Sequence, residues 1–215
     1  MGKRDRSGKR TERDTFRKRV PELGMYVIFT DAKKTESNYV YKFKESLSKD
    51  NQKKISIKIM HEKTEDLVKA CREDYTTRPQ FCEPWIIFDR DQVSNFDKMI
   101  QDAENNGIKV GWSNPCIEIW FSAYFGNMDN GWDTSTKCCG KFGELFQRKT
   151  GQEYKKSNPN NYQLLKRYGD EKKAIRIADK KLQNYLSNGI SPSKMYACTT
   201  LHYLIKDIIE KTENL

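Results

Sequence analysis

Short apolar segments alternate with helical patterns along the first half of the chain, and this alternation limits the fold more than any other feature. Strand-length runs rich in β-branched and aromatic residues occur at 25–30, 55–60, 85–89 and 108–112. Apolar residues at helical spacing lie between them, at 35–47, 62–75 and 94–105. Strands separated by helices favour a parallel sheet that is covered on both faces. The sequence therefore predicts an α/β fold.

The second half of the chain carries helical patterns in place of strands. We expect helices near 116–125, 141–149, 159–167, 170–187 and 198–213, and a mobile polar loop at 126–140. The sequence thus divides into a basic flexible arm at 1–22, an α/β core at 23–125 and a helical C-terminal extension at 126–215 that packs on the core.

The charge balance favours polyanionic partners. Lysine and arginine number 40 against 30 aspartate and glutamate residues, which gives a net charge of +10. Nucleic acid is the first candidate partner, and a merely solvated basic surface is the alternative. The chain contains no apolar run of membrane-spanning length and no secretory leader pattern, so we expect a soluble cytoplasmic protein without a membrane partner.

Six cysteines are scattered without paired CxxC motifs, and the chain has two histidines. This spacing argues against a zinc site and against a disulfide framework, and it favours reduced, buried thiols. The adjacent Cys138 and Cys139 are the one pair for which a redox role stays open.

Acidic residues follow two of the predicted strands. Asp31 ends the first strand, and Asp89 and Asp91 end the third, in the segment WIIFDRD. If these strands are neighbours, the three carboxylates converge at one sheet edge and repel one another unless a cation neutralises them. Mg²⁺ or Mn²⁺ is the natural occupant. Glu36 and Glu118 could face the same cluster, although strand-end carboxylates also serve as turn and helix caps.

Three enzyme classes place a D-x-D segment after an apolar strand. Phosphatases of the haloacid dehalogenase type would use Asp89 as nucleophile and Asp91 as acid/base, but their motif begins the domain and needs a later acidic pair that this chain lacks. Metal-dependent glycosyltransferases rarely carry so basic a charge. In the Toprim fold of topoisomerases, primases and related nucleases, an acidic residue after the first strand joins a later D-x-D in binding Mg²⁺.

Several motifs, in the same order along the chain, resemble those of the RloB-like family, whose members are small Toprim-like proteins of bacterial phage defence. VIFTDAKKTESNY matches the family's first motif, with Asp31 in place of glutamate and Ala32 in place of glycine. IIFDRD and SNPCIEIW match the next two, and YKKSNPNNYQLL and YACTTLHYLI match later blocks. Tyr124 and Phe125 stand where the family often has a His-Phe pair.

The resemblance implies a Toprim-like α/β core and a Mg²⁺-dependent (or Mn²⁺-dependent) nuclease, an effector that cleaves RNA, perhaps tRNA, or DNA. It assigns the metal to Asp31, Asp89 and Asp91, and catalysis to these three with Glu36 and Glu118. We expect substrate contacts from six further residues, Lys33, Lys34, Arg90, Ser113, Asn114 and His202. The implied partner is an SMC/OLD-type ATPase, and self-association into a homo-oligomer is left open. The alternative is a non-catalytic adaptor that binds nucleic acid or a phage trigger, which the changes at Asp31 and Ala32 favour.

Overall fold

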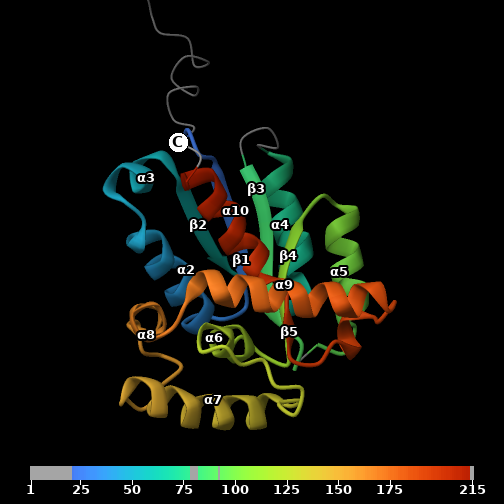
Figure 1. The fold of residues 1–215 in the computed structure, drawn as a ribbon. Coiled ribbons are helices and arrows are strands. Elements are labelled where there is room, and N and C mark those ends of the chain that lie inside the picture. Colours follow the sequence, from blue (N-terminus) through green and yellow to red (C-terminus); the bar gives the residue numbers. More distant parts are fainter. Residues whose placement is uncertain (1–20, 78–81, 92, 214–215) are drawn as a thin grey trace, which may run out of the picture.

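A computed structural model describes residues 21–77, 82–91 and 93–213 of the 215-residue chain. Within these residues, five strands form one sheet in the order β2-β1-β3-β4-β5 (Figure 1). The strands are β1 (Met25–Thr30), β2 (Ser56–His61), β3 (Cys82–Asp89), β4 (Lys109–Asn114) and β5 (Cys198–Thr199). The first four run parallel, and β5 pairs antiparallel with β4. The predicted basic arm lies outside the described residues, apart from Pro21 and Glu22.

Helices connect and follow the strands. Between the parallel strands lie α2 (Thr35–Ser46), α3 (Lys49–Lys54), η1 (Thr64–Asp66), α4 (Leu67–Thr76) and α5 (Phe96–Asn105). After β4 come α6 (Glu118–Tyr124), α7 (Ser135–Thr150), α8 (Asn161–Tyr168), α9 (Glu171–Ser187), η2 (Pro192–Lys194) and α10 (Leu201–Glu213). In the described part of the chain, none of these helices has the length and apolar character that crossing a membrane requires.

Side-chain alternation along β1 sends residues into two separate cores. Tyr26 and Ile28 pack with buried residues of α2, α6 and α10, whereas Val27 and Phe29 pack with those of α4 and α5. Figure 1 accordingly shows α10 in front of the sheet and α4 behind it. Gly111 of β4 permits a close approach by α10, because a Cβ atom there would lie 3.2 Å from a methyl carbon of Leu201.

The predicted α/β class is confirmed, with a mostly parallel sheet, flanking helices and a helical C-terminal part, which is consistent with a Toprim-like fold. One correction concerns the segment 126–140, which was predicted to be a loop. Its last residues belong to α7, which begins at Ser135 after Thr134 accepts a capping hydrogen bond from the Lys137 backbone N–H. The polar side chains and the glycines of this stretch concealed the helix start.

The predicted C-terminal extension at 126–215 also contributes to the sheet and to its core. It supplies β5 at the sheet edge, while residues of α9 and α10 enter the same core as β1 and β3. The helices α6 and α7 lie at the lower end of Figure 1, where the parallel strands finish. This end of the molecule therefore combines strand ends, α6, α7 and the segment that follows α7.

Candidate active site

The strands that carry the predicted aspartates are neighbours. β1 pairs with β3 in parallel, with Thr30 opposite Ile87, so Asp31 follows β1 on the same edge at which Asp89 ends β3. The turn after Asp89 is held against the β4–α6 connection, because the Arg90 N–H donates to the Ser113 carbonyl at 2.9 Å and the Asp91 N–H to that of Pro115 at 3.3 Å. The two strands are therefore neighbours, as convergence of the predicted carboxylates requires.

Glu36, Asp89 and Glu118, hereafter the acidic cluster, interact electrostatically at this edge. Glu36 is buried in the first turn of α2, and Glu118 is fully buried at the first residue of α6. Removal from water, and then repulsion by Glu118 and Asp31, raises the pKa of Glu36 to about 7. Removal from water, and then repulsion by Glu36, Glu118 and Asp91, raises the pKa of Asp89 well above its ordinary range. Without a cation, Glu36 and Asp89 therefore ionise less readily than ordinary carboxyl groups.

Two carboxylate oxygens of the acidic cluster have no hydrogen-bond partner among the described residues. They are Glu36 Oε2 and Glu118 Oε2, and both are buried. A buried acceptor without a partner is costly, which marks this site as one that can accept a cation or a donor group.

Asp31 and Asp91 flank the acidic cluster. Asp31 is partly buried and accepts a hydrogen bond from the Thr64 hydroxyl, and its charge contributes to the raised pKa of Glu36. Asp91 is exposed, and its charge contributes to the raised pKa of Asp89. The structure thus arranges the five predicted catalytic carboxylates as two buried glutamates and a half-buried Asp89, with one flanking residue beside each of Glu36 and Asp89.

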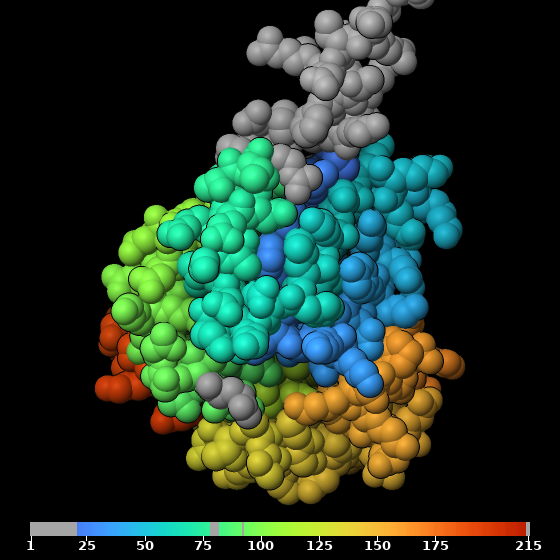
Figure 2. Space-filling view, turned by 180° about the vertical axis from the view of Figure 1, so that it is seen from behind, coloured from blue at the N-terminus to red at the C-terminus, as the bar shows by residue number. Residues whose placement is uncertain are grey.

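Tyr154 and Lys156 also contact Glu118, and sequence reasoning assigned them no role. The Tyr154 hydroxyl donates to Glu118 Oε1 at 2.9 Å, and Lys156 Nζ lies 3.2 Å from the same oxygen. The Thr35 hydroxyl donates to the Lys156 carbonyl at 3.4 Å, which ties this segment to the start of α2. In Figure 2 the segment after α7, in orange, accordingly lies beside the blue start of α2. The signal was present in the motif YKKSNPNNYQLL, which contains both residues.

A buried tyrosine network fixes the two helices that carry Glu36 and Glu118. The Tyr39 hydroxyl of α2 lies 2.7 Å from that of Tyr124 in α6, and Tyr124 donates to Glu171 Oε1 at 2.8 Å. Because Tyr39 is one turn beyond Glu36, this contact sets the position of the first turn of α2 against α6.

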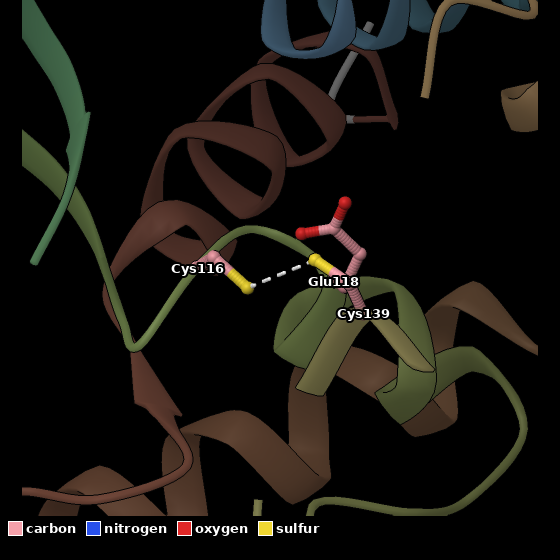
Figure 3. A group of neighbouring side chains, drawn as sticks. All are labelled: Cys116, Glu118 and Cys139. Atoms are coloured by element: carbon pink, nitrogen blue, oxygen red, sulfur yellow. Dashed lines mark hydrogen bonds between the residues drawn. The ribbon is translucent and has the colours of Figure 1, made fainter. Parts of the chain in front are cut away.

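Cys116 and Cys139 lie beside Glu118 (Figure 3). Their sulfur atoms are 3.9 Å apart, and both thiols are free. Among the described residues, these three side chains form the one set whose ligand atoms all lie within 4.8 Å of one another. The predicted metal-binding trio, Asp31, Asp89 and Asp91, is not such a set in the structure.

Comparison with known families now identifies the chain. The model of the family described as RloB-like protein matches residues 26–208. The chain belongs to the RloB-like protein family. The predicted resemblance is thereby confirmed, and the match includes the acidic cluster, both flanking aspartates and the thiols. No curated protein and no solved structure matches the chain.

The predicted substrate-binding residues of this RloB-like protein occupy different surroundings. Lys33 and Lys34 are both exposed, and Lys33 lines a hollow together with Asp31. Arg90 lines a separate hollow with Asn95 and Asp97.

The other three predicted contacts are interior. The Ser113 hydroxyl is 3.1 Å from that of Thr199, and the Asn114 amide donates to the carbonyls of Pro192 and Ser193. His202 is fully buried 3.7 Å from Asp179, and burial lowers its pKa to about 4.

Proposed function

We propose that this RloB-like protein is a metal-dependent nuclease that acts as an effector in bacterial phage defence. The observation that carries the proposal is the acidic cluster at the carboxyl ends of neighbouring parallel strands, with raised pKa values and two buried carboxylate oxygens that lack partners. An all-oxygen donor set suits Mg²⁺ or Mn²⁺. Asp31, Asp89 and Asp91 would hold the metal, with Glu36 and Glu118 as further ligands or as the base.

The metal would supply positive charge that polarises the scissile phosphate and stabilises charge on the attacking and leaving oxygens. Glu36 is suited to proton transfer, because burial and its acidic neighbours raise its pKa to about 7. A carboxyl group with that pKa in the metal-free chain exchanges a proton readily at neutral pH, and a bound cation would favour its ionised form, which can accept a proton from an attacking water. Tyr154 donates to Glu118 and keeps that carboxylate oriented.

Nucleic acid is the proposed substrate class. The net charge of +10 favours a polyanion, and the exposed Lys33 and Lys34 follow β1 beside Asp31. RNA, including tRNA, and DNA both fit these features. An SMC/OLD-type ATPase is the proposed partner, on the basis of the family resemblance.

One observation favours a second candidate, a non-catalytic adaptor that binds nucleic acid or a phage trigger. Lys156 already places an ammonium group 3.2 Å from Glu118, so part of the cluster's charge is neutralised within the chain. In an adaptor, that ion pair would hold the sheet edge together and no divalent metal would be needed.

Calorimetric titration with Mg²⁺ and Mn²⁺ separates the two candidates. We expect the wild-type chain to bind and the Asp89→Asn, Asp91→Asn double variant to lose binding. Asp102→Asn with Glu104→Gln is the matched control, since it removes the same charge from exposed positions of α5. Mg²⁺-dependent cleavage of tRNA, single-stranded RNA or DNA should follow the same pattern. If wild-type protein binds no metal even with nucleic acid present, the nuclease proposal is wrong and the adaptor is favoured.

A further inference from the structure

Three ligand atoms of different chemistry meet beside the acidic cluster. Cys116 precedes α6, Glu118 begins it, and Cys139 lies in the first half of α7 (Figure 3). The two sulfur atoms are 3.9 Å apart, and the three ligand atoms lie within 4.8 Å of one another. Two thiolates on one tetrahedral zinc, with Zn–S bonds of about 2.3 Å, are about 3.8 Å apart. The observed sulfur separation therefore fits two ligands of one metal ion.

An independent observation comes from Glu118. Its side chain is fully buried, and Oε2 has no hydrogen-bond partner among the described residues. The other oxygen, Oε1, already accepts from Tyr154 and faces Lys156. One oxygen is thus held in place while the second remains available to a cation, which would remove the cost of burying it unpaired.

The fold already attracts a positive charge to this group. The ammonium group of Lys156 lies 3.2 Å from Glu118 Oε1, so the chain itself already places a cation beside this group. The Lys156 side chain is 53% exposed, so its ammonium group can move into solvent when another cation enters. The position beside Glu118 therefore favours a cation, and the ammonium group of Lys156 can leave it.

We propose that Cys116, Cys139 and Glu118 form a binding site for a thiophilic divalent cation such as Zn²⁺, next to the acidic cluster and sharing Glu118 with it. Sulfur ligands favour zinc over magnesium, and three protein ligands leave the fourth tetrahedral position for water. Occupation of this site would withdraw Glu118 from the acidic cluster. Only that consequence rests on the proposed nuclease function; the binding site itself does not.

The test is titration of the reduced, chelator-treated full chain with Zn²⁺ alone, followed by Co²⁺ as a spectroscopic substitute. We expect one Zn²⁺ per chain and a sulfur-to-cobalt charge-transfer band. The Cys116→Ser, Cys139→Ser double variant should lose the band and bind Zn²⁺ at least about a hundredfold more weakly, since loss of even an outer-shell partner costs up to that much. Glu118→Gln should weaken Zn²⁺ binding but retain the band.

Cys71→Ser with Cys198→Ser is the matched control, because it removes two buried thiols far from Glu118 in the sequence. Cys139→Ser alone provides a second variant at a half-buried position, where misfolding is least expected. Unchanged Zn²⁺ affinity in both thiol variants would overturn the proposal. So would a wild-type chain that binds no Zn²⁺ and instead forms a Cys116–Cys139 disulfide under mild oxidation.

A competition experiment addresses the shared carboxylate. If the chain cleaves nucleic acid with Mg²⁺, low Zn²⁺ should inhibit the wild type, and the Cys116→Ser, Cys139→Ser variant should resist inhibition at least about tenfold better. Inhibition that is equal in the two proteins would overturn the idea that the sites share Glu118. Failure of cleavage altogether would contradict the proposed nuclease and would leave the Zn²⁺ titration as the test of the thiol site.

Discussion

The two ends of the parallel strands differ in how their acidic side chains are paired with cations. At the amino end, Glu83 near the start of β3 is bonded to Lys211 and lies 3.0 Å from Lys109. Asp207 lies 3.1 Å from Lys211 and accepts a hydrogen bond from the Tyr26 hydroxyl. At the carboxyl end, Lys156 lies 3.2 Å from Glu118 and its charge also acts on Glu36, whereas the charges that act most on Asp89 are those of other carboxylates. The amino end is thus neutralised within the chain, and the carboxyl end is not.

Opposite pKa shifts follow from this difference. Burial raises the pKa of Asp207, but hydrogen bonds from Tyr26 and Lys211 outweigh it and hold that pKa below its ordinary value. For Asp89, burial and neighbouring carboxylates act in the same direction and raise the pKa. The aspartate of α10 beside the amino end of the sheet is therefore held as an anion, whereas the aspartate at the carboxyl end is readily protonated.

The largest expected effect compares two carboxyl groups of β3. Asp89→Asn should reduce Mg²⁺-dependent cleavage by about a thousandfold or more, because the loss of a metal ligand removes several kcal/mol of transition-state stabilisation. Glu83→Gln, at the paired end, should change the cleavage rate by less than about threefold but lower the free energy of unfolding. Single-turnover cleavage and urea unfolding measure both. Equal loss of cleavage in the two variants would mean that the acidic end has no special role.

The next effect concerns Glu36 and pH. Its pKa is about 7 in the folded chain against an ordinary 4.5, so between these values the folded state binds more protons than the unfolded state. Stability should therefore fall as pH rises from 4.5 to 7. Without divalent metal, Glu36→Gln should be more stable than wild type at pH 8, by up to about 3 kcal/mol, and similar at pH 4.

Glu45→Gln, on the exposed part of the same helix, is the control for Glu36→Gln. Urea unfolding at both pH values, in the presence of a chelator, provides the measurement. An unchanged pH dependence in Glu36→Gln would show that repulsion in the acidic cluster is relieved in another way.

A smaller effect is expected at the amino end of the strands, where Lys211 pairs with Glu83 and Asp207. Lys211→Met leaves Glu83 and Asp207 beside each other without their shared cation, which should destabilise the fold by about 1–2 kcal/mol. Lys206→Met, which loses a 3.8 Å pair with Glu210 on the exposed side of the same helix, should cost less than about 0.5 kcal/mol. Thermal or urea unfolding at neutral pH distinguishes the two, and equal costs would mean that the amino end gains nothing from its pairing.

Local patterns in the sequence predicted the sheet and the carboxylates, because both depend on spacing within one element. Asp89 ends a continuous apolar strand, and Glu36 lies in the first turn after β1, so their place at one edge follows from parallel pairing. The helix α3 was missed because its six residues, KDNQKK, bury no side chain and so carry no apolar period. The strand β5 has two residues, too few for an alternation to be recognised.

The parts of the site that escaped prediction depend on tertiary contacts. Cys116 and Cys139 are 23 residues apart and belong to different elements, so no ligand-spacing motif connects them, and the sequence argued against a zinc site. Lys156 lies in an irregular segment whose position is set by its contacts with α2 and α6. Residues of this kind become visible only when the chain is folded.

The smallest effect concerns Lys156, which pairs with Glu118 at the carboxyl end much as Lys211 pairs with Glu83 at the amino end. Lys156→Met should raise the apparent Mg²⁺ affinity by about three- to tenfold, because the metal no longer competes with an ammonium group 3.2 Å from Glu118. Lys155→Met is the matched control, since that neighbouring lysine pairs with the exposed Glu153 at 3.3 Å. Calorimetry on both variants gives the answer. A fall in Mg²⁺ affinity on loss of Lys156 would reverse the interpretation, because Lys156 would then hold Glu118 in place for the metal and not compete with it.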